Sequence, residues 1–363
     1  MPETPPRGAP PSFPLGRLTA IGAVLATLGA GFAYAGGWLS PGRITPGRIV
    51  DALSERGGDP TGHRRNHAKG ICFTGRFEAS GEGARLSTAP MLAAGRYPVV
   101  GRFAIGTGDP VAPDASGRVR SMAIRIAAPD GQEWRTGMNN MPVFPVATLE
   151  AFYELTLASR VDPATGTPRD PQAVPRFVAA HPEMRAFLGW AGSAPWTPSY
   201  AEEDYHALNA FFFVDAAGAR RAVRWAVLGT VPPEPRSPAE LQALGPDFLG
   251  RDLVARLGQG PLRWRMVAQL AGPDDPVDDP TRAWPAEREQ VTLGTLVVEQ
   301  AQPEASGPCR DVNYDPLVLP AGIEPSRDPI LLARSPAYAA SYLRRQAELG
   351  QVPALARGAG AGR

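Results

Sequence analysis

Four prolines fix the course of the chain up to and including the first residue of its last predicted helix, and they constrain the fold more than any other feature. Three of them lie in the run Tyr314-Asp-Pro-Leu-Val-Leu-Pro-Ala-Gly-Ile-Glu-Pro-Ser326, and the fourth follows in Asp328-Pro329. An aspartate before a proline is a typical helix start, since the carboxylate can cap the helix and proline fits its first position. Few folds need so long a proline-rich approach to a helix.

The helix that starts at Pro329 carries Arg334 and Tyr338. Positions i and i+4 lie on one face of a helix, so the guanidinium of Arg334 can donate a hydrogen bond to the phenolic oxygen of Tyr338. A fixed cation nearby favours the deprotonated phenol, and a phenolate is a hard, anionic ligand suited to ferric iron. This spacing is common by chance, so the interpretation depends on the surrounding motifs.

Two further motifs precede this segment. His67-Ala-Lys-Gly70 comes three residues after Arg64, and Asn139-Asn140-Met-Pro-Val-Phe144 lies further along the chain. With the proline-rich approach and Tyr338, they resemble the haem catalase superfamily, in particular its short branch of catalase-related peroxidases. The resemblance covers residues 60–347 and keeps the family order of distal histidine, distal asparagine and proximal tyrosine.

The resemblance implies a role for each of these side chains. Tyr338 would be the iron ligand and Arg334 the partner of its phenolate. His67 would be the general acid and base that moves a proton between the two peroxide oxygens. Asn140 would orient the peroxide through its amide, and Phe144 would be apolar lining near the haem.

Arginines occupy three positions that contact the haem propionates in the family, namely Arg64, Arg102 and Arg345. A guanidinium group is well suited to bind a carboxylate. One departure from the family pattern stands out. Ala104 occupies the place where typical catalases have a serine that hydrogen-bonds the distal histidine. Losing that partner loosens the orientation of the ring, which weakens the second step of dismutation, in which another peroxide is oxidised.

The predicted secondary structure is mixed. Runs rich in Val, Ile and aromatic residues, bounded by Gly, Pro or Asp, predict eight strands over 70–79, 99–106, 119–126, 133–138, 206–214, 220–228, 262–269 and 291–299. Helices are expected over 149–159 and 173–188, and after Ser237, which opens a capping box with Glu240. Periodicity alone supports only a mixed α and β protein. The resemblance implies an α+β fold with a closed eight-stranded antiparallel β-barrel and flanking α-helices, preceded by an N-terminal hydrophobic helix.

The segment 18–39 runs for 22 residues without a charge, which is long enough to span a bilayer. Ala33-Tyr-Ala35 also fits a signal cleavage site, so an uncleaved anchor and a cleaved signal both remain open. Either would place the rest of the chain outside the cytoplasm. The expected organisation is a polar segment over 1–17, the anchor or signal over 18–39, a linker over 40–59, the haem domain over 60–350 and a flexible tail over 351–363.

Composition excludes several classes of partner and cofactor. A formal net charge of +1 gives no electrostatic basis for nucleic-acid binding. The two cysteines form no Cys-x-x-Cys-His motif, which disfavours a covalent c-type haem, and Cys72 reads as a small buried hydrophobe in an apolar strand. The chain ends 25 residues after Tyr338, so the flavodoxin-like region of longer catalases is not expected, nor is bound NADPH.

The sequence therefore predicts a haem b peroxidase that reduces hydrogen peroxide or organic hydroperoxides through an oxidised (ferryl) haem, with a small-molecule electron donor, in the response to oxidative stress. The expected location is the periplasmic side of the inner membrane, attached through residues 18–39, or the periplasm after cleavage. A true catalase is the alternative within enzymology. A haem carrier or sensor is the alternative from another class, although His67 and Asn140 argue against it. The donor and the oligomeric state stay open.

Overall fold

The computed structural model describes residues 15–36, 39, 42–57, 59–162 and 164–351, and it divides the chain into two units, Met1–Thr45 and Pro46–Arg363. In the first unit, helix α1 (Leu15–Ala35) contains a stretch, Gly16–Tyr34, that is long and apolar enough to cross a membrane. A signal sequence has the same properties. Most of the predicted polar segment and tail, residues 1–14 and 352–363, lie outside the described residues.

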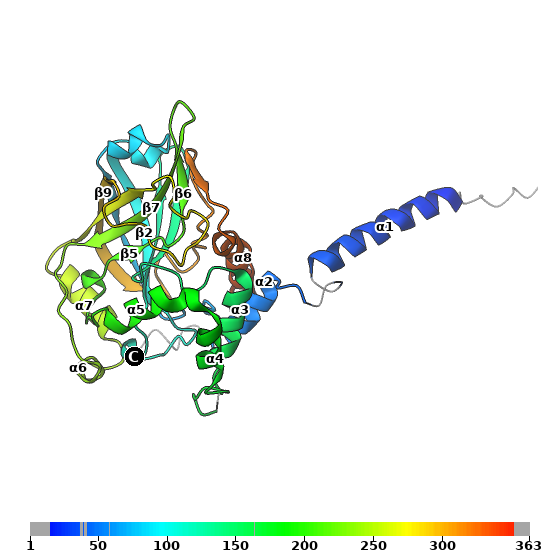
Figure 1. The fold of residues 1–363 in the computed structure, drawn as a ribbon, viewed down its shortest axis with the longest axis horizontal. Helices are drawn as coiled ribbons and strands as arrows, with labels where there is room; N and C mark the ends of the chain where they lie inside the picture. The colour runs from blue at the N-terminus through cyan, green and yellow to red at the C-terminus, as the bar shows by residue number, and fades with distance from the viewer. Residues whose placement is uncertain (1–14, 37–38, 40–41, 58, 163, 352–363) are drawn as a thin grey trace, which may run out of the picture. The chain divides into compact units, whose positions relative to one another are not determined.

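The second unit is built on one antiparallel sheet that closes on itself (Figure 1). Its strands are β1 (Gly70–Ala79), β2 (Gly95–Ile105), β3 (Arg120–Ala127), β4 (Glu133–Asn139), β5 (Tyr205–His206), β6 (Phe211–Val214), β7 (Arg220–Gly229), β8 (Leu262–Leu270), β9 (Gln290–Pro303) and β10 (Ile323–Pro325). The order β7-β5-β4-β3-β2-β1-β9-β8 returns to β7, while β6 pairs with β7 and β10 with β6. The prediction of a closed eight-stranded antiparallel barrel is confirmed.

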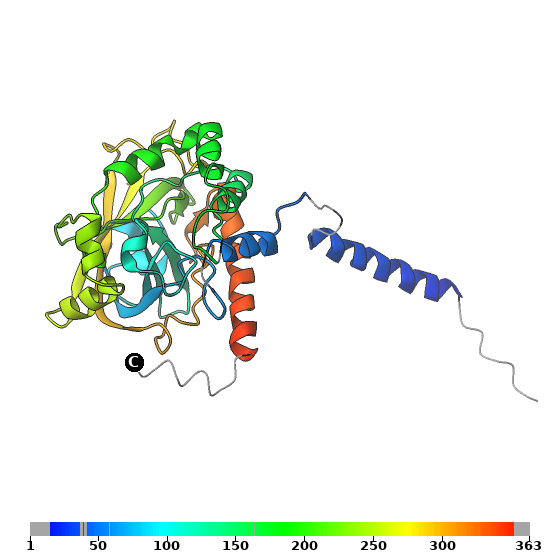
Figure 2. The same cartoon turned by 90° about the horizontal axis from the view of Figure 1, so that it is seen from below.

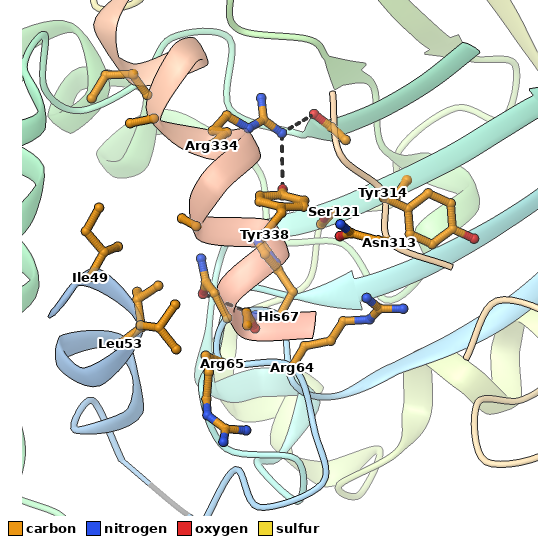
Figure 3. Close-up of a pocket in the computed structure, with 18 of the residues that line it drawn as sticks. Ile49, Leu53, Arg64, Arg65, His67, Ser121, Asn313, Tyr314, Arg334 and Tyr338 are labelled. Carbon is orange, nitrogen blue, oxygen red and sulfur yellow. Dashed lines mark hydrogen bonds between the residues drawn. The ribbon is translucent and has the colours of Figure 1, made fainter. Parts of the chain in front are cut away.

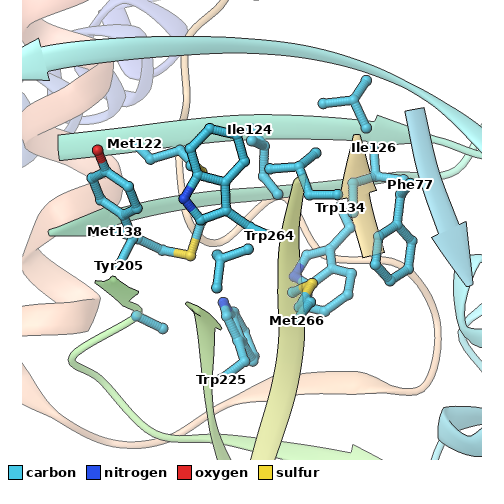
Figure 4. Packing of buried hydrophobic residues seen from close by; sticks show 14 of the residues in the cluster. Phe77, Met122, Ile124, Ile126, Trp134, Met138, Tyr205, Trp225, Trp264 and Met266 are labelled. Atoms are coloured by element: carbon cyan, nitrogen blue, oxygen red, sulfur yellow. The ribbon is translucent and has the colours of Figure 1, made fainter. Parts of the chain in front are cut away.

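Large apolar side chains fill the inside of the barrel (Figure 4). Side chains alternate along a strand, so every second residue points inward. The fully buried indoles of Trp134, Trp225 and Trp264 occupy the centre, and Trp225 donates a hydrogen bond from Nε1 to Thr136 Oγ1 at 3.0 Å. Burying a large apolar side chain contributes about 1.5–3 kcal/mol, so this cluster is a main source of stability. The same alternation leaves the other residues of each strand on the outer face.

Three helices cover one side of the barrel: α2 (Pro46–Ser54), α3 (Leu149–Ala158) and α8 (Pro329–Gln351) (Figure 2). Helix α2 packs against α8 and α3, and it falls within the segment 40–59 that the sequence assigns to a linker. The remaining helices are α4 (Ala173–Ala180), α5 (Arg185–Ser193), α6 (Pro238–Ala243) and α7 (Phe248–Leu257). The predicted capping box of Ser237 and Glu240 is present at the start of α6.

Two predicted elements are each divided in the structure. The strand predicted over 206–214 becomes β5 and β6, because Leu208 adopts a left-handed backbone conformation with φ 68°. The helix predicted over 173–188 becomes α4 and α5, which are separated by a short 3-10 turn, Pro182–Met184. Proline cannot donate the backbone hydrogen bond that a continuous helix needs there, so Pro182 divides the helix.

The two cysteines form a disulfide bond that joins β1 to the segment after β9. Cys72 is buried, as predicted, but it is not a free thiol, so the prediction of a simple hydrophobe is wrong. The sequence separation of 237 residues hides this pairing from any local pattern. Cys72 lies opposite Arg102 in the pairing of β1 with β2, which places the disulfide beside the cavity described next.

Candidate active site

A cavity lies on the outer face of the barrel, beneath α8, α2 and α3 (Figure 3). Strands β2, β3 and β4 provide one wall, and α8 provides another with Arg334, Tyr338 and Arg345. The loop ahead of β1 contributes His67 and its neighbours, and α2 contributes apolar side chains such as Leu53. The site is therefore assembled from segments far apart in the sequence.

Strand register sets which barrel side chains reach the cavity. Arg102, Ala123 and Gly137 are direct neighbours across β2, β3 and β4, and each of them lines it. In the adjacent row, Ser121 lies between Ala104 and Asn139, and both Ser121 and Asn139 line the cavity. Directly opposed residues in a sheet point to the same face. The two rows thus form a small grid of side chains on the outer surface of the barrel.

The predicted hydrogen bond between Arg334 and Tyr338 is present, with a distance of 3.2 Å from Nη2 to the phenolic oxygen (Figure 3). The same Nη2 donates to the carbonyl of Gly137 at 3.1 Å, and Nη1 donates to Asn209 Oδ1 at 2.8 Å. Asn209 in turn donates to Asp328 Oδ2 at 2.6 Å. These contacts, which do not involve the phenol, hold the guanidinium in position beside it.

Asp328 also starts helix α8, as predicted. Its Oδ1 accepts a hydrogen bond from the backbone N–H of Ile330 at 2.8 Å. One carboxylate thus caps the helix and orients Asn209. This arrangement connects the proline-rich approach directly to the position of Tyr338.

Gly137 lets the barrel approach the phenol closely. A Cβ at this position would lie 3.0 Å from Arg334 Nη2 and 3.5 Å from the Tyr338 oxygen. A larger side chain would displace one of these two groups. Gly137 therefore preserves space beside the phenolic oxygen.

His67 lies in the loop ahead of β1 with a left-handed backbone conformation, φ 55°. Its Nδ1 is buried and makes no hydrogen bond within the described part of the chain. Burial, followed by the nearby cations Arg102 and Arg56, lowers the pKa of His67 to about 3. The imidazole is therefore neutral near pH 7.

The loop that carries His67 is anchored on its far side by Lys69. The ammonium of Lys69 pairs with Asp114 at 2.9 Å and Asp247 at 2.7 Å, and it donates to the carbonyls of Ala112 and Pro246. These oxygens keep the lysine away from the cavity. The loop is thus held by contacts on the side away from the cavity, while His67 lines the cavity.

The structure corrects the asparagine assignment. Asn139, the last residue of β4, lines the cavity, whereas Asn140 does not. The Asn140 side chain accepts a hydrogen bond from the Arg120 N–H at 2.9 Å and donates one to Glu203 at 2.9 Å. Successive residues of a strand point to opposite faces, so only one of the two asparagines can reach the cavity.

The three predicted arginines gather at one edge of the cavity around a single carboxylate. Glu304 accepts from Arg64 at 3.2 Å and from Arg102 at 2.6 Å. Arg345 is buried, and its Nη2 makes no hydrogen bond within the described residues. The electrostatic influence of these three cations lowers the pKa of Glu304 against the opposing effect of burial, which is the largest single cause. Three guanidinium groups around one carboxylate leave a clear excess of positive charge.

Phe144 also lines the cavity, as predicted, and packs against Phe152 of α3. Several residues were missed by sequence reasoning, among them Gly137, Asn209 and Glu304. Strand alternation from Asn139 could have identified Gly137, since the two are separated by two positions. No local pattern indicates Asn209 or Glu304, because each acts through a partner distant in the sequence.

The two asparagines provide a prediction about stability. Asn140→Ala should lower the free energy of unfolding by about 1–3 kcal/mol, because it removes the donor to Glu203 Oε2 and the acceptor of the Arg120 N–H, both of which are buried. Asn139→Ala is the matched control and should change stability much less, since its buried Oδ1 makes no hydrogen bond within the described chain. Urea denaturation of both variants measures the difference. Equal losses would contradict the two orientations.

The chain is similar to proteins of one known family. The model of the Catalase family matches residues 49–354. The chain is 38% identical over 329 residues to a catalase-related peroxidase of Synechococcus elongatus, covering 90% of this chain and 95% of that one. It is 35% identical over 305 residues to a catalase-related peroxidase of Mycolicibacterium paratuberculosis, covering 84% and 96%.

Longer catalases match over part of their length. A catalase of Pseudomonas aeruginosa is 28% identical over 291 residues, which cover 77% of this chain and 56% of that one. The structure of a fungal catalase superposes with a TM-score of 0.71 at 20% identity, over 78% of this chain and 59% of the other, which supports the fold. Taken with the family match and the two shorter relatives, these similarities show that the chain belongs to the catalase family, in its short catalase-related peroxidase branch.

Proposed function

We propose that this chain is a haem-dependent peroxidase that reduces hydrogen peroxide or organic hydroperoxides at the expense of a small electron donor. One observation carries the proposal. A single cavity holds both the Tyr338 phenol, hydrogen-bonded to the fixed Arg334 guanidinium, and the neutral imidazole of His67. The first group suits ferric iron, and the second can move the protons of a peroxide.

The residues around the cavity fit haem b. The excess positive charge of Arg64, Arg102 and Arg345 over Glu304 matches the two propionates of a protoporphyrin, and the free Nη2 of Arg345 is available to one of them. Apolar side chains such as Phe144 line the remainder. Haem bound here would supply an iron centre able to accept and pass on electrons.

The proton transfers fall to the chain itself. Reduction of a hydroperoxide to an alcohol and water consumes two electrons and two protons. His67 would take a proton from one peroxide oxygen and return it to the departing oxygen, which a neutral imidazole can do. The amide of Asn139, rather than that of Asn140, would orient the peroxide, because only Asn139 reaches the cavity.

Ala104 favours peroxidation over dismutation. A methyl group is buried where a hydroxyl would have steadied the distal histidine, and Nδ1 of His67 is left without a hydrogen bond in the described chain. Oxidation of a second hydrogen peroxide depends on that histidine more strictly than electron transfer from an outside donor does. A carrier or sensor would not need His67 and Asn139 facing the same cavity.

We further propose that the haem domain works outside the cytoplasm, on the periplasmic side of the inner membrane. The apolar helix α1 can act as an anchor or as an export signal. The disulfide of Cys72 and Cys309 supports this location, because disulfides persist mainly in oxidising compartments.

Replacement of the proposed iron ligand tests the cofactor. Tyr338→Phe keeps the ring but removes the oxygen that Arg334 contacts at 3.2 Å. We expect this variant to lose haem affinity and the absorption spectrum of a ferric tyrosinate haem. Haem titration followed by absorption spectroscopy measures both. An unchanged spectrum would place the iron ligand elsewhere.

Replacement of the distal base tests the reaction. His67→Ala should still bind haem, since Tyr338 is untouched, while its reaction with peroxide slows by about 10²–10⁴-fold. Stopped-flow absorbance after mixing with an alkyl hydroperoxide gives this rate. In wild type we expect steady oxidation of small aromatic donors with little oxygen evolution. Oxygen evolution at the rate of a long catalase would indicate a true catalase instead.

The compartment can be tested on the native protein. Fractionated cells should hold the chain with the membranes, or in the periplasm if the signal is cleaved. Alkylation under denaturing conditions should label neither Cys72 nor Cys309 until a reductant is added, because the two are paired. Recovery of intact protein from the cytosol with both thiols free would refute the proposed location.

A further inference from the structure

We propose that Ser121 is a positioning residue of the peroxide site, whose hydroxyl acts through the amide of Asn139. The inference deepens the proposed peroxidase function and depends on it. It places a distal hydroxyl on β3, one strand away from Ala104, where the chain has a methyl group. Neither the sequence motifs nor the conspicuous charges of the site point to this residue.

Strand register supplies the first argument. Ser121 is the direct neighbour of Ala104 on β2 and of Asn139 on β4. Residues opposed in this manner have Cβ atoms about 4.5–5.5 Å apart and point to the same face. Both Ser121 and Asn139 line the cavity, so their polar ends face the same space on the outer face of the barrel.

The lack of partners supplies the second argument. Ser121 is only 8% exposed, and its hydroxyl makes no hydrogen bond within the described residues. The buried Oδ1 of Asn139 has no hydrogen bond there either. Leaving a buried atom such as Asn139 Oδ1 unpaired costs about 1–3 kcal/mol, so natural sites keep such atoms when a ligand completes them.

Chemistry suggests how the two groups cooperate. A serine hydroxyl can donate to the amide oxygen of Asn139, which directs the amide NH₂ of Asn139 toward a bound peroxide. The hydroxyl can also accept a hydrogen bond from the peroxide itself. Either contact holds the peroxide that reacts first. Neither contact replaces the hydrogen bond that a serine at position 104 on β2 would give to His67. The position of this hydroxyl therefore favours peroxide reduction over the oxidation of a second peroxide at His67.

The test uses the full-length, haem-loaded protein and two measurements. The first is the dissociation constant of cyanide, a small ligand of ferric haem that accepts hydrogen bonds from distal donors. The second is the rate of reaction with an alkyl hydroperoxide. Ser121→Ala should weaken cyanide binding and slow the reaction by about three- to tenfold each, the effect of one neutral hydrogen bond. Haem content and melting temperature should stay close to wild type, because the hydroxyl has no partner in the described chain.

Two double variants separate the position of the hydroxyl from mere polarity. Ala104→Ser added to Ser121→Ala returns a hydroxyl to the same row of the sheet, on β2. Ala123→Ser in the same background puts it on β3, one row along, beside Arg102 and Gly137. We expect cyanide affinity to recover in neither double variant, because position 104 lies two strands from Asn139 and position 123 lies one row along from it.

Two results would overturn the inference. One is wild-type cyanide affinity and peroxide rate in Ser121→Ala; the other is recovery in either double variant, which would mean that a hydroxyl not opposite Asn139 suffices. Cyanide binding is measured without turnover. A wild-type protein that binds haem but does not react with peroxide would therefore refute the proposed function, while the cyanide series would still decide the role of Ser121.

Discussion

The guanidinium of Arg334 joins the parts of the molecule on which the site depends. It links helix α8 to strand β4 through the carbonyl of Gly137, and to the segment between β5 and β6 through Asn209. Asn209 is itself held by Asp328, the residue that caps α8. The start of the helix, the segment between β5 and β6 and the position of Tyr338 are therefore linked by one connected group of hydrogen bonds. A small displacement of any member would move the phenol.

Strand alternation explains both what the sequence predicts and where the prediction stops. The same period of two that sends Phe103 inward sends Arg102 to the cavity, so strand positions and the closed barrel could be predicted from apolar runs and the family resemblance. To choose between Asn139 and Asn140, one must know which of the two side chains points to the outer face at the end of β4. The sequence does not determine this. Helix α2 could have been found, since Ile49, Val50 and Leu53 have helical spacing, and Pro46 is a favourable first residue.

The remaining features could not be predicted because they depend on contacts between distant segments. Glu304 pairs with two arginines more than 200 residues earlier. Leu208 has a left-handed backbone conformation just after β5, and such a conformation is usually predicted only for glycine or asparagine. The arginine edge also receives support from backbone carbonyls, since Arg64 donates to those of Cys309 and Val312. Such contacts form only when the whole domain has folded. They place the arginine side chains at the edge of the cavity.

The disulfide has a consequence for the order of events during biosynthesis. Cys72 leaves the ribosome 237 residues before Cys309, so its thiol must wait, unpaired, until most of the domain has been synthesised. Because the chain has only two cysteines, no wrong intramolecular pairing competes with the native one. The disulfide can therefore form only after β1 and the segment after β9 have come into contact. The covalent bond then fixes, at the end of assembly, the carbonyls that position Arg64 at the edge of the cavity.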